Sequence, residues 1–357
     1  MKKIIALALA LLMIISFVAC AEKDDGKGSE TETAANTEAL TTDTPETETE
    51  REVDYSTEIK ITVISGTTGM GFAKMMTDAK NGEAKFPYSF ELVSDAEGAK
   101  SAILGGTADL AAVPTNLAAV LAAKTNGGVQ IVAANTEGVL YLLQNGEEIK
   151  NMSNLAGKTI YCCQQGANPE YITSYLLKNN GYEVGKDVFL DFTYNSPDEL
   201  ASALASGLVD NAVLPEPKVT ATLAKNENLR VALNFTEEWK NVTNGAPLIQ
   251  GCLIATKAFI DEHGPELDAF LEEYKESISY NLDVDNYFDA ANLIADLGII
   301  PNANIAMKAL PYCNLCFMTG NDMVTGIMST LTALYDANPA SVGGAEPNPD
   351  TLFYIGK

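Results

Sequence analysis

The sequence predicts an α/β protein of two lobes, with mostly parallel sheets and a mainly helical C-terminal part. Three observations lead to this prediction. From residue 59 onward, short apolar strands alternate with helical segments, an order typical of parallel strands joined by crossover helices. The same order of elements returns about one hundred residues later. After residue 253, the apolar residues follow helical spacing instead.

The first repeat is expected to contain strands and helices in strict alternation. The strands are short apolar runs bounded by turn residues, whereas the helices carry small and apolar residues at helical spacing. The expected strands are 59–64, 90–93, 110–113 and 130–133. The expected helices run from the loop 65–71 through Met76, and over 96–104 and 116–123.

The second repeat is expected to contain the same elements. Its strands are 159–163, 188–192, 211–214 and 229–233, and its helices run from the loop 164–169 through Leu177, and over 198–205 and 219–224. Turn residues match in register: Gly66 with Gly166, 106–109 with 207–210, Pro114 with Pro215, and 136–137 with 236–237. Any one match is weak, but together they favour two α/β lobes.

The repeat sets the expected domain boundaries. The first lobe comprises residues 58–150 and 251–357, and the second comprises residues 151–250. Two connections, near 138–150 and 248–256, would cross between the lobes as a hinge. Open α/β sheets bind ligands at the carboxyl ends of their strands, so we expect a site in the cleft between the lobes.

Composition excludes several function classes. The chain has 357 residues and a net charge of −25, without any basic block, so we expect no nucleic-acid partner. His263 is the only histidine and lies in a charged helical segment, which argues against histidine-based metal sites and catalytic triads. We therefore expect no catalytic residues, no cofactor and no metal.

The first twenty residues have the features of an export signal. Two lysines precede an uncharged apolar run at residues 4–19 that is short for a membrane-spanning helix. The run ends in Phe-Val-Ala-Cys, which resembles a bacterial lipobox in which Phe17 replaces the usual Leu. This resemblance implies that Cys20 becomes the lipidated N-terminus of a protein anchored at the extracytoplasmic face of the cell membrane. A signal anchor is the alternative.

Residues 21–57 differ in composition from the rest of the chain. They are rich in Thr and Glu, contain few apolar residues and carry mostly negative charge, so they cannot bury enough surface to fold. We predict a disordered acidic tether that holds the folded part away from the membrane.

Three segments carry a family resemblance. Residues 154–160 open the second lobe with Asn-Leu-Ala-Gly-Lys-Thr-Ile, 207–217 end in Pro-Glu-Pro, and 338–344 read Asn-Pro-Ala-Ser-Val-Gly-Gly. With Cys20, they resemble substrate-binding lipoproteins of ABC importers over residues 58–357, in the nitrate, sulfonate, taurine and thiamine-pyrimidine branch. The resemblance implies a monomeric, periplasmic-binding-protein-like (type 2) clamp. Such a clamp closes on a small-molecule solute by hinge motion and delivers it to a membrane permease.

In the first lobe, a small polar loop precedes the first helix. Its backbone N–H groups, with the helix dipole behind them, suit an anion or a polar oxygen, while an ordinary glycine-rich turn is the alternative. The candidate residues of this loop are Ser65, Gly66, Thr67, Thr68 and Gly69. Thr115 and Asn116 follow the third strand at the same sheet edge, where a helix N-cap is the alternative.

In the second lobe, the equivalent loops give four candidates. Asn168 precedes Pro169, a pattern typical of a helix N-cap, so Gln165 and Gly166 are the stronger candidates of their loop. Glu216 lies between two prolines, where its carboxylate would accept from a cationic or amine-bearing ligand; a solvated turn acid is the alternative. The candidate loops contain no Lys or Arg, which favours a neutral, zwitterionic or cationic solute.

The cysteines and two other function classes remain open. Apart from Cys20 there are five cysteines, so not all can pair, and buried thiols are the expected state with a Cys313–Cys316 disulfide as the alternative. Pyrimidine-synthase-like enzymes of the same superfamily are one alternative function, although those use a histidine as substrate and His263 lies away from every candidate loop. A surface adhesin or signalling lipoprotein is the other.

Overall fold

Two β-sheets organise the part of the chain that the computed structural model describes, residues 51–146 and 148–356. The signal, Cys20 and residues 21–50 lie outside the described residues. The strands of the first sheet, in spatial order, are β11 (Leu315–Met318), β4 (Val129–Glu137), β10 (Ile249–Thr256), β3 (Leu110–Pro114), β1 (Ile59–Ile64) and β2 (Tyr88–Val93). Those of the second are β7 (Phe189–Asp191), β6 (Thr159–Cys162), β8 (Asn211–Pro215), β5 (Leu140–Gln144) and β9 (Arg230–Asn234).

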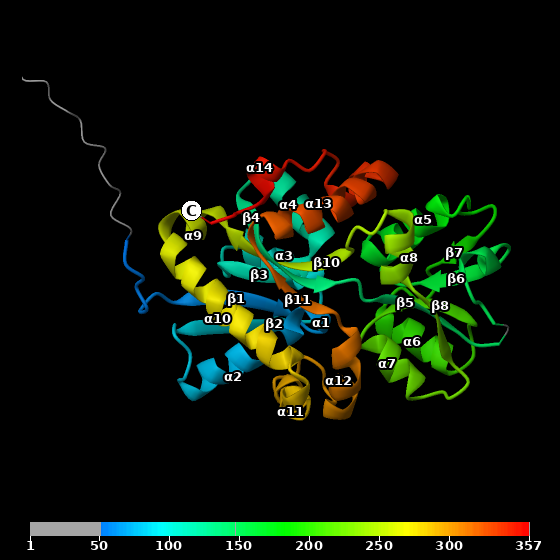
Figure 1. Cartoon of the computed structure of the whole chain (residues 1–357), viewed down its shortest axis with the longest axis horizontal. Helices are drawn as coiled ribbons and strands as arrows, with labels where there is room; N and C mark the ends of the chain where they lie inside the picture. The colour runs from blue at the N-terminus through cyan, green and yellow to red at the C-terminus, as the bar shows by residue number, and fades with distance from the viewer. Residues whose placement is uncertain (1–50, 147, 357) are drawn as a thin grey trace, which may run out of the picture. The chain divides into compact units, whose positions relative to one another are not determined.

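The helices connect and cover these sheets. The helices that lie next to strands of the first sheet along the sequence are α1 (Thr67–Met70), α2 (Ala73–Asn81), α3 (Ala96–Leu104), α4 (Thr115–Lys124), α9 (Lys257–Glu262), α10 (Gly264–Leu282), α11 (Tyr287–Asp296), α12 (Ala303–Ala309), α13 (Gly320–Ala337) and α14 (Pro349–Leu352). Those around the second are α5 (Asn168–Asn179), α6 (Pro197–Ala205), α7 (Lys218–Leu223) and α8 (Phe235–Val242). Figure 1 shows β5 to β8 and α5 to α8 grouped apart from the first sheet.

The predicted α/β fold class is confirmed, and every predicted strand and helix of the two repeats has a counterpart. The sheets are mixed rather than mostly parallel, however. β1, β2 and β3 pair in parallel, as do β6, β7 and β8, whereas β10 and β5 pair antiparallel with both of their neighbours. Each of these two strands follows directly on a segment of the other group: β5 follows β4 of the first sheet, and β10 follows α8 beside the second.

The first chain segment that connects the two sheets is shorter than the predicted connection at residues 138–150. Residues 140–144, assigned to the first lobe, form β5 of the second sheet, and the first crossing is confined to Gly138 and Val139 between β4 and β5. A Cβ atom at Gly138 would lie 2.1 Å from the Thr236 hydroxyl, so only glycine fits this close approach. Gln250 of β10 accepts a hydrogen bond from the Val139 N–H at 2.7 Å, which joins the two crossings.

Both sheets are buried on their two faces, which explains the near-continuous apolar strands. In β1, Ile59, Ile61 and Val63 are at most 1% exposed and pack with Phe72, Phe270 and Tyr274 of the covering helices. A parallel strand covered by helices on both faces requires such a sequence. The helical C-terminal part covers the first sheet as predicted, through α10 and α11 on one face and α13 on the other.

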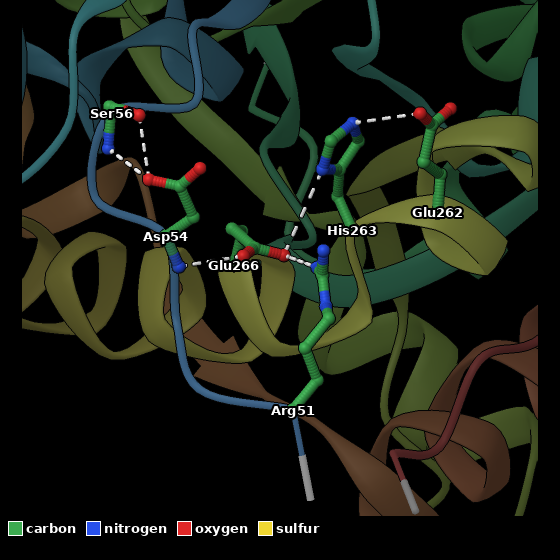
Figure 2. A network of polar contacts seen from close by, with 6 residues as sticks. All are labelled: Arg51, Asp54, Ser56, Glu262, His263 and Glu266. Carbon is green, nitrogen blue, oxygen red and sulfur yellow. Dashed lines mark hydrogen bonds and ion pairs between the residues drawn. The ribbon is translucent and has the colours of Figure 1, made fainter.

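The first described residues are fixed to helix α10 by a buried carboxylate. Glu266 is fully buried, forms an ion pair with Arg51 and accepts a hydrogen bond from the Asp54 N–H at 2.8 Å (Figure 2). The Nδ1 atom of His263 lies 3.8 Å from the same carboxylate. The chain is thus tied to the folded part from residue 51, earlier than the predicted end of the tether at residue 57.

Among the described residues, no helix combines the length and apolar character needed to cross a membrane.

Candidate functional site

A cavity of about 850 Å³ lies at the boundary of the two groups of elements. Its walls come from the β1–α1 loop and the ends of β3 and β4 on one side, and from the loops after β6 and β8 and the start of α6 on the other. The segment before α12 contributes a third wall. The loops after parallel strands thus meet at one cavity, which is the arrangement by which open α/β sheets bind small molecules.

The β1–α1 loop lines the cavity through Ser65, Gly66, Thr67 and Thr68. Gly66 has a φ of 106°, a conformation that favours glycine, and its N–H donates to the Ile299 carbonyl at 3.2 Å. The Thr67 hydroxyl donates to the backbone carbonyl of Glu216 at 2.8 Å, which joins the two sides of the cavity.

Three candidates of the first lobe do not line the cavity. A Cβ at Gly69 would lie 2.4 Å from the Ile64 carbonyl, so this glycine permits close packing of α1 on β1. Thr115 and Asn116 are buried and donate to the carbonyls of Ile249, at 2.9 Å, and Ser341, at 3.5 Å. Neither is the helix N-cap: Pro114 takes that position in α4 and lines the cavity itself.

In the β6–α5 loop, the structure reverses the expected order of the candidates. Gln165 and Gly166 are exposed and lie outside the cavity wall, whereas Gln164 and Asn168 belong to it. The Gln165 and Gly166 N–H groups donate to Asn195 and Glu170, respectively. The N-cap of α5 is Ala167, so the capping role predicted for Asn168 is wrong.

Asn168 instead has a buried side-chain oxygen without a partner among the described residues. The residue is 6% exposed, and its Oδ1 atom is buried without a hydrogen bond from any described residue. A buried amide oxygen without a donor costs free energy, which a ligand donor would recover. Asn168 thus lines the cavity with an unpartnered side-chain oxygen, where a helix cap was expected.

Glu216 belongs to the second wall of the cavity. It is 4% exposed, and its two carboxylate oxygens accept from the Thr220 N–H at 3.1 Å and the Thr220 hydroxyl at 3.0 Å. No described residue forms an ion pair with it. Burial raises the pKa of Glu216 to about 7, although the hydrogen bonds from Thr220 act in the opposite direction. Glu216 is therefore a buried acid and not a solvated turn acid.

The cavity wall contains two lysines, although the candidate loops themselves contain no Lys or Arg. Lys218, directly after the Pro-Glu-Pro turn, forms an ion pair with Asp198 of α6. Lys225 is exposed at the wall beyond α7. Asp95 also lines the cavity and caps α3 through a hydrogen bond from the Gly98 N–H at 3.0 Å.

Sequence reasoning missed two parts of the wall. Residues 298–302 and Ile305 line the cavity from the segment between α11 and α12, which the sequence assigned only to covering the sheet. Asn195, Ser196 and Pro197 line it at the start of α6, where Ser196 and Glu199 form a reciprocal capping box. The sequence signal for this second part was present, because Ser-Pro-Asp-Glu is typical of a helix start.

The other chemistry-bearing residues are mainly cysteines, one of which, Cys313, lies near Thr67 and Glu216 of the cavity wall. The five cysteines of the described part are free thiols, and four of them are buried, as expected. Burial raises the pKa of Cys316 to about 12, which keeps it protonated at neutral pH. The described residues include no group of three or more His, Cys, Asp or Glu side chains that could hold a metal ion. A shallower hollow of about 620 Å³ over α6 contains none of the predicted site residues.

Comparisons with solved structures identify the fold. A crystal structure of an ABC transporter protein of Parabacteroides distasonis matches with a TM-score of 0.69 and 21% identity over 84% of this chain and 99% of that one. The periplasmic aliphatic sulphonate-binding protein SsuA of Escherichia coli matches with a TM-score of 0.67 and 16% identity, over 84% and 92%. The periplasmic nitrate-binding protein NrtA of Synechocystis PCC 6803 matches with a TM-score of 0.60 and 13% identity, over 85% and 88%.

Sequence comparison gives the family. No curated protein sequence matches the chain significantly. Residues 91–284 match the family described as NMT1/THI5 like, and this match spans more than half of the chain. The predicted resemblance to the nitrate, sulfonate and thiamine-pyrimidine branch is confirmed, and the chain belongs to the NMT1/THI5-like family.

Proposed function

We propose that this protein is the solute-binding component of an ABC importer. It captures a small polar molecule between two lobes and delivers it to a membrane permease. The observation that carries the proposal is the cavity whose walls come from strand-end loops of both sheets. The names of the similar structures, which include sulphonate- and nitrate-binding periplasmic proteins, support the same role.

The proposed clamp has a hinge and a latch. The lobes correspond to the two sheets, with the boundary of the first crossing moved from residue 150 to Gly138. Gly138 and Val139 on one side and the start of β10 on the other form the hinge. The Thr67–Glu216 hydrogen bond and the packing of α12 on α7 join the lobes at the cavity. Opening at the hinge would break these contacts and admit a solute.

The site we propose combines residues from both lobes. Ser65 to Thr68 contribute from the first, and Gln164, Asn168 and Glu216 contribute from the second. Gly69, Thr115, Asn116, Gln165 and Gly166 are assigned to packing and loop structure instead.

The protein would act without chemistry of its own, as a monomer at the extracytoplasmic face of the cell membrane. Cys20 would carry the lipid and residues 21–50 would form the tether, which keeps the clamp near its permease. His263, the only histidine, contacts Glu266 away from the cavity wall, which argues against the enzyme alternative. Cys20→Ala should abolish acylation in mass spectrometry; acyl chains on that variant would overturn the anchor.

The binding role is tested by thermal unfolding with a broad panel of sugars, amino acids, amines and small anions. A solute that raises the melting temperature should lose affinity in Thr68→Val and in Asn168→Leu, one variant on each side of the cavity. Each loss should be roughly 5- to 100-fold, because each removes one hydrogen-bonding group. Gln165→Ala is the matched control, since that side chain lies outside the cavity wall.

Two outcomes would contradict the proposal. If no compound of the panel stabilises the protein, the cavity is not a solute site and the adhesin or signalling alternative gains support. If a solute binds but is indifferent to the variants on one side, the site is not shared between the lobes.

A further inference from the structure

Two buried acceptor-bearing residues of the cavity wall, Asn168 and Glu216, come from neighbouring loops. β6 and β8 pair in parallel, so the loop that follows each of them leaves the same edge of the sheet. The first loop leads to Asn168 and the second carries Glu216. Both residues are more than nine-tenths buried, and both line the cavity.

Neither acceptor is saturated by the chain. The Asn168 Oδ1 atom accepts no hydrogen bond from any described residue. Each oxygen of Glu216 accepts a single hydrogen bond, both from Thr220, although a carboxylate oxygen has two lone-pair positions. A carboxylate taken out of water without a cation loses solvation that Thr220 alone does not replace. Glu216 therefore has capacity for a donor from within the cavity. The Asn168 oxygen has almost no accessible surface, so a ligand donor would reach it only after its side chain rotates.

The charge around the cavity disfavours an anion. Its wall holds three acids, Asp95, Asp198 and Glu216, against two lysines. Lys218 is already paired with Asp198, and Lys225 is exposed. Among the described residues, no arginine lines the cavity, so the bidentate group that usually holds sulfonate or phosphate oxygens is missing from this wall. An anion placed beside Glu216 would be repelled by its carboxylate.

The remainder of the wall suits an apolar body. Ile64, Leu140, Ile299, Ile300 and Ile305 line the same cavity. A ligand with a charged or N–H-rich end and an apolar remainder would find hydrogen-bond acceptors at one wall and apolar contacts at the others.

We infer that the solute of this cavity is an amine or amidine on a partly apolar body, whose N–H groups donate to Glu216 and Asn168. This inference rests on the proposed function and narrows it to one class of solute. That class differs from the anions, sulphonate and nitrate, for which two of the similar structures are named. A cation bound there would hold Glu216 in its ionised form, since an opposite charge favours the carboxylate.

The test uses two series of compounds that share one skeleton and differ in charge. Benzamidine, benzamide and benzoate form one series, and putrescine, 1,4-butanediol and succinate form the other. Affinities for the full-length protein are measured by isothermal titration calorimetry at pH 8, and melting temperatures by thermal unfolding. In at least one series, the cation should bind most tightly, the neutral compound at least tenfold more weakly, and the anion not at all.

Variants locate the binding. Glu216→Gln should weaken binding of the cation at least tenfold, because it removes a charge-assisted hydrogen bond. Asn168→Asp adds a second carboxylate and should strengthen it, whereas Asn168→Leu should weaken it, so the inference is testable even if Glu216→Gln fails to fold. Glu273→Gln is the matched control: Glu273 is another buried acid, bonded to Lys85 and Tyr88 and outside the cavity wall.

The outcomes separate this inference from the proposed function. If an anion binds and no cation does, the inference is overturned while the solute-binding role stands. If Glu216→Gln and Asn168→Asp both leave the affinity of the cation within twofold, the cation binds elsewhere and the inference is again overturned. If neither these compounds nor the broad panel bind, both the inference and the proposed function fail.

Discussion

Glu216 and Glu266 are both buried carboxylates, yet they have different surroundings. Glu266 is paired with Arg51 and accepts the Asp54 N–H, so both of its oxygens are engaged by the chain. Glu216 faces a cavity, and its hydrogen bonds come from Thr220 alone. The first arrangement fixes a chain segment, whereas the second keeps acceptor capacity for something that the chain does not supply. Burial by itself therefore does not distinguish a structural acid from a binding one, but the source of its partners does.

The largest effect should follow from removing the structural acid. Glu266→Ala leaves Arg51 and the Asp54 N–H without their partner, although Arg51 is half-exposed and can be hydrated. We expect a loss of about 3 kcal/mol in the free energy of unfolding, the low end for breaking a buried pair. Urea unfolding measures it, and Glu262→Ala, an exposed acid beside the same histidine, should cost less than about 0.5 kcal/mol. Equal losses of stability in the two variants would contradict a structural role for Glu266.

Removing the charge of the cavity acid, Glu216, should increase the free energy of unfolding. The pKa of Glu216 is about 7 in the folded protein against an ordinary value of 4.5, so the folded state holds a proton that the unfolded state releases between these values. Wild-type stability is therefore lost as pH rises from 4.5 through 7. Glu216→Gln lacks this loss but gives up one Thr220 hydrogen bond, so we expect it to be more stable than wild type by about 1–2 kcal/mol at pH 8.

The control for this prediction is pH itself. Near pH 4, where Glu216 is protonated in both states, the advantage of Glu216→Gln should disappear. A variant that is less stable than wild type at pH 8 would mean that the carboxylate is satisfied by the chain, as Glu266 is.

A third buried acid gives an intermediate case. Glu273 accepts from the Tyr88 hydroxyl at 2.6 Å and the Lys85 N–H at 3.0 Å. Tyr88→Phe removes one of these donors, so we expect a loss of about 1 kcal/mol in the free energy of unfolding, measured with urea. Solute affinity should be unchanged, and a change would connect this acid to the cavity.

The smallest effect is expected at the only histidine. The ring of His263 lies 3.8 Å and 3.9 Å from Glu266 and Glu262, too far for hydrogen bonds, and packs against Phe259. His263→Gln should change the free energy of unfolding by less than about 1 kcal/mol and leave solute binding intact. A catalytic or binding role would instead appear as lost affinity.

The difference between the two acids also shows what sequence could predict. Glu216 was found from its position between two prolines after a strand, a local signal. Glu266 was not, because its partner Arg51 lies 215 residues away and nothing local connects them. The exposure of Gln165 and the burial of Asn168 likewise depend on where α5 begins, one residue after Ala167, a boundary that the sequence pattern does not resolve.

The fold shows the same limit. Alternating apolar runs predicted the strands and helices of both repeats, because periodicity and turn residues are local. The antiparallel pairing of β5 and β10 with their neighbours was not predicted, since strand pairing is decided by tertiary contacts. Residues 136–137 and 236–237, matched by the sequence, lie in a strand and a helix, respectively, so that match does not reflect equivalent structure.

Hydrogen–deuterium exchange, measured with and without the best-binding panel compound, tests whether one solute contacts both lobes. We expect bound solute to slow exchange in residues 65–68 of the first lobe and also in 164–168 and 216–220 of the second, because all three segments border one cavity. The hollow over α6 serves as the internal reference. Protection confined to one lobe, or centred on residues 199–208, would contradict a solute held between the two.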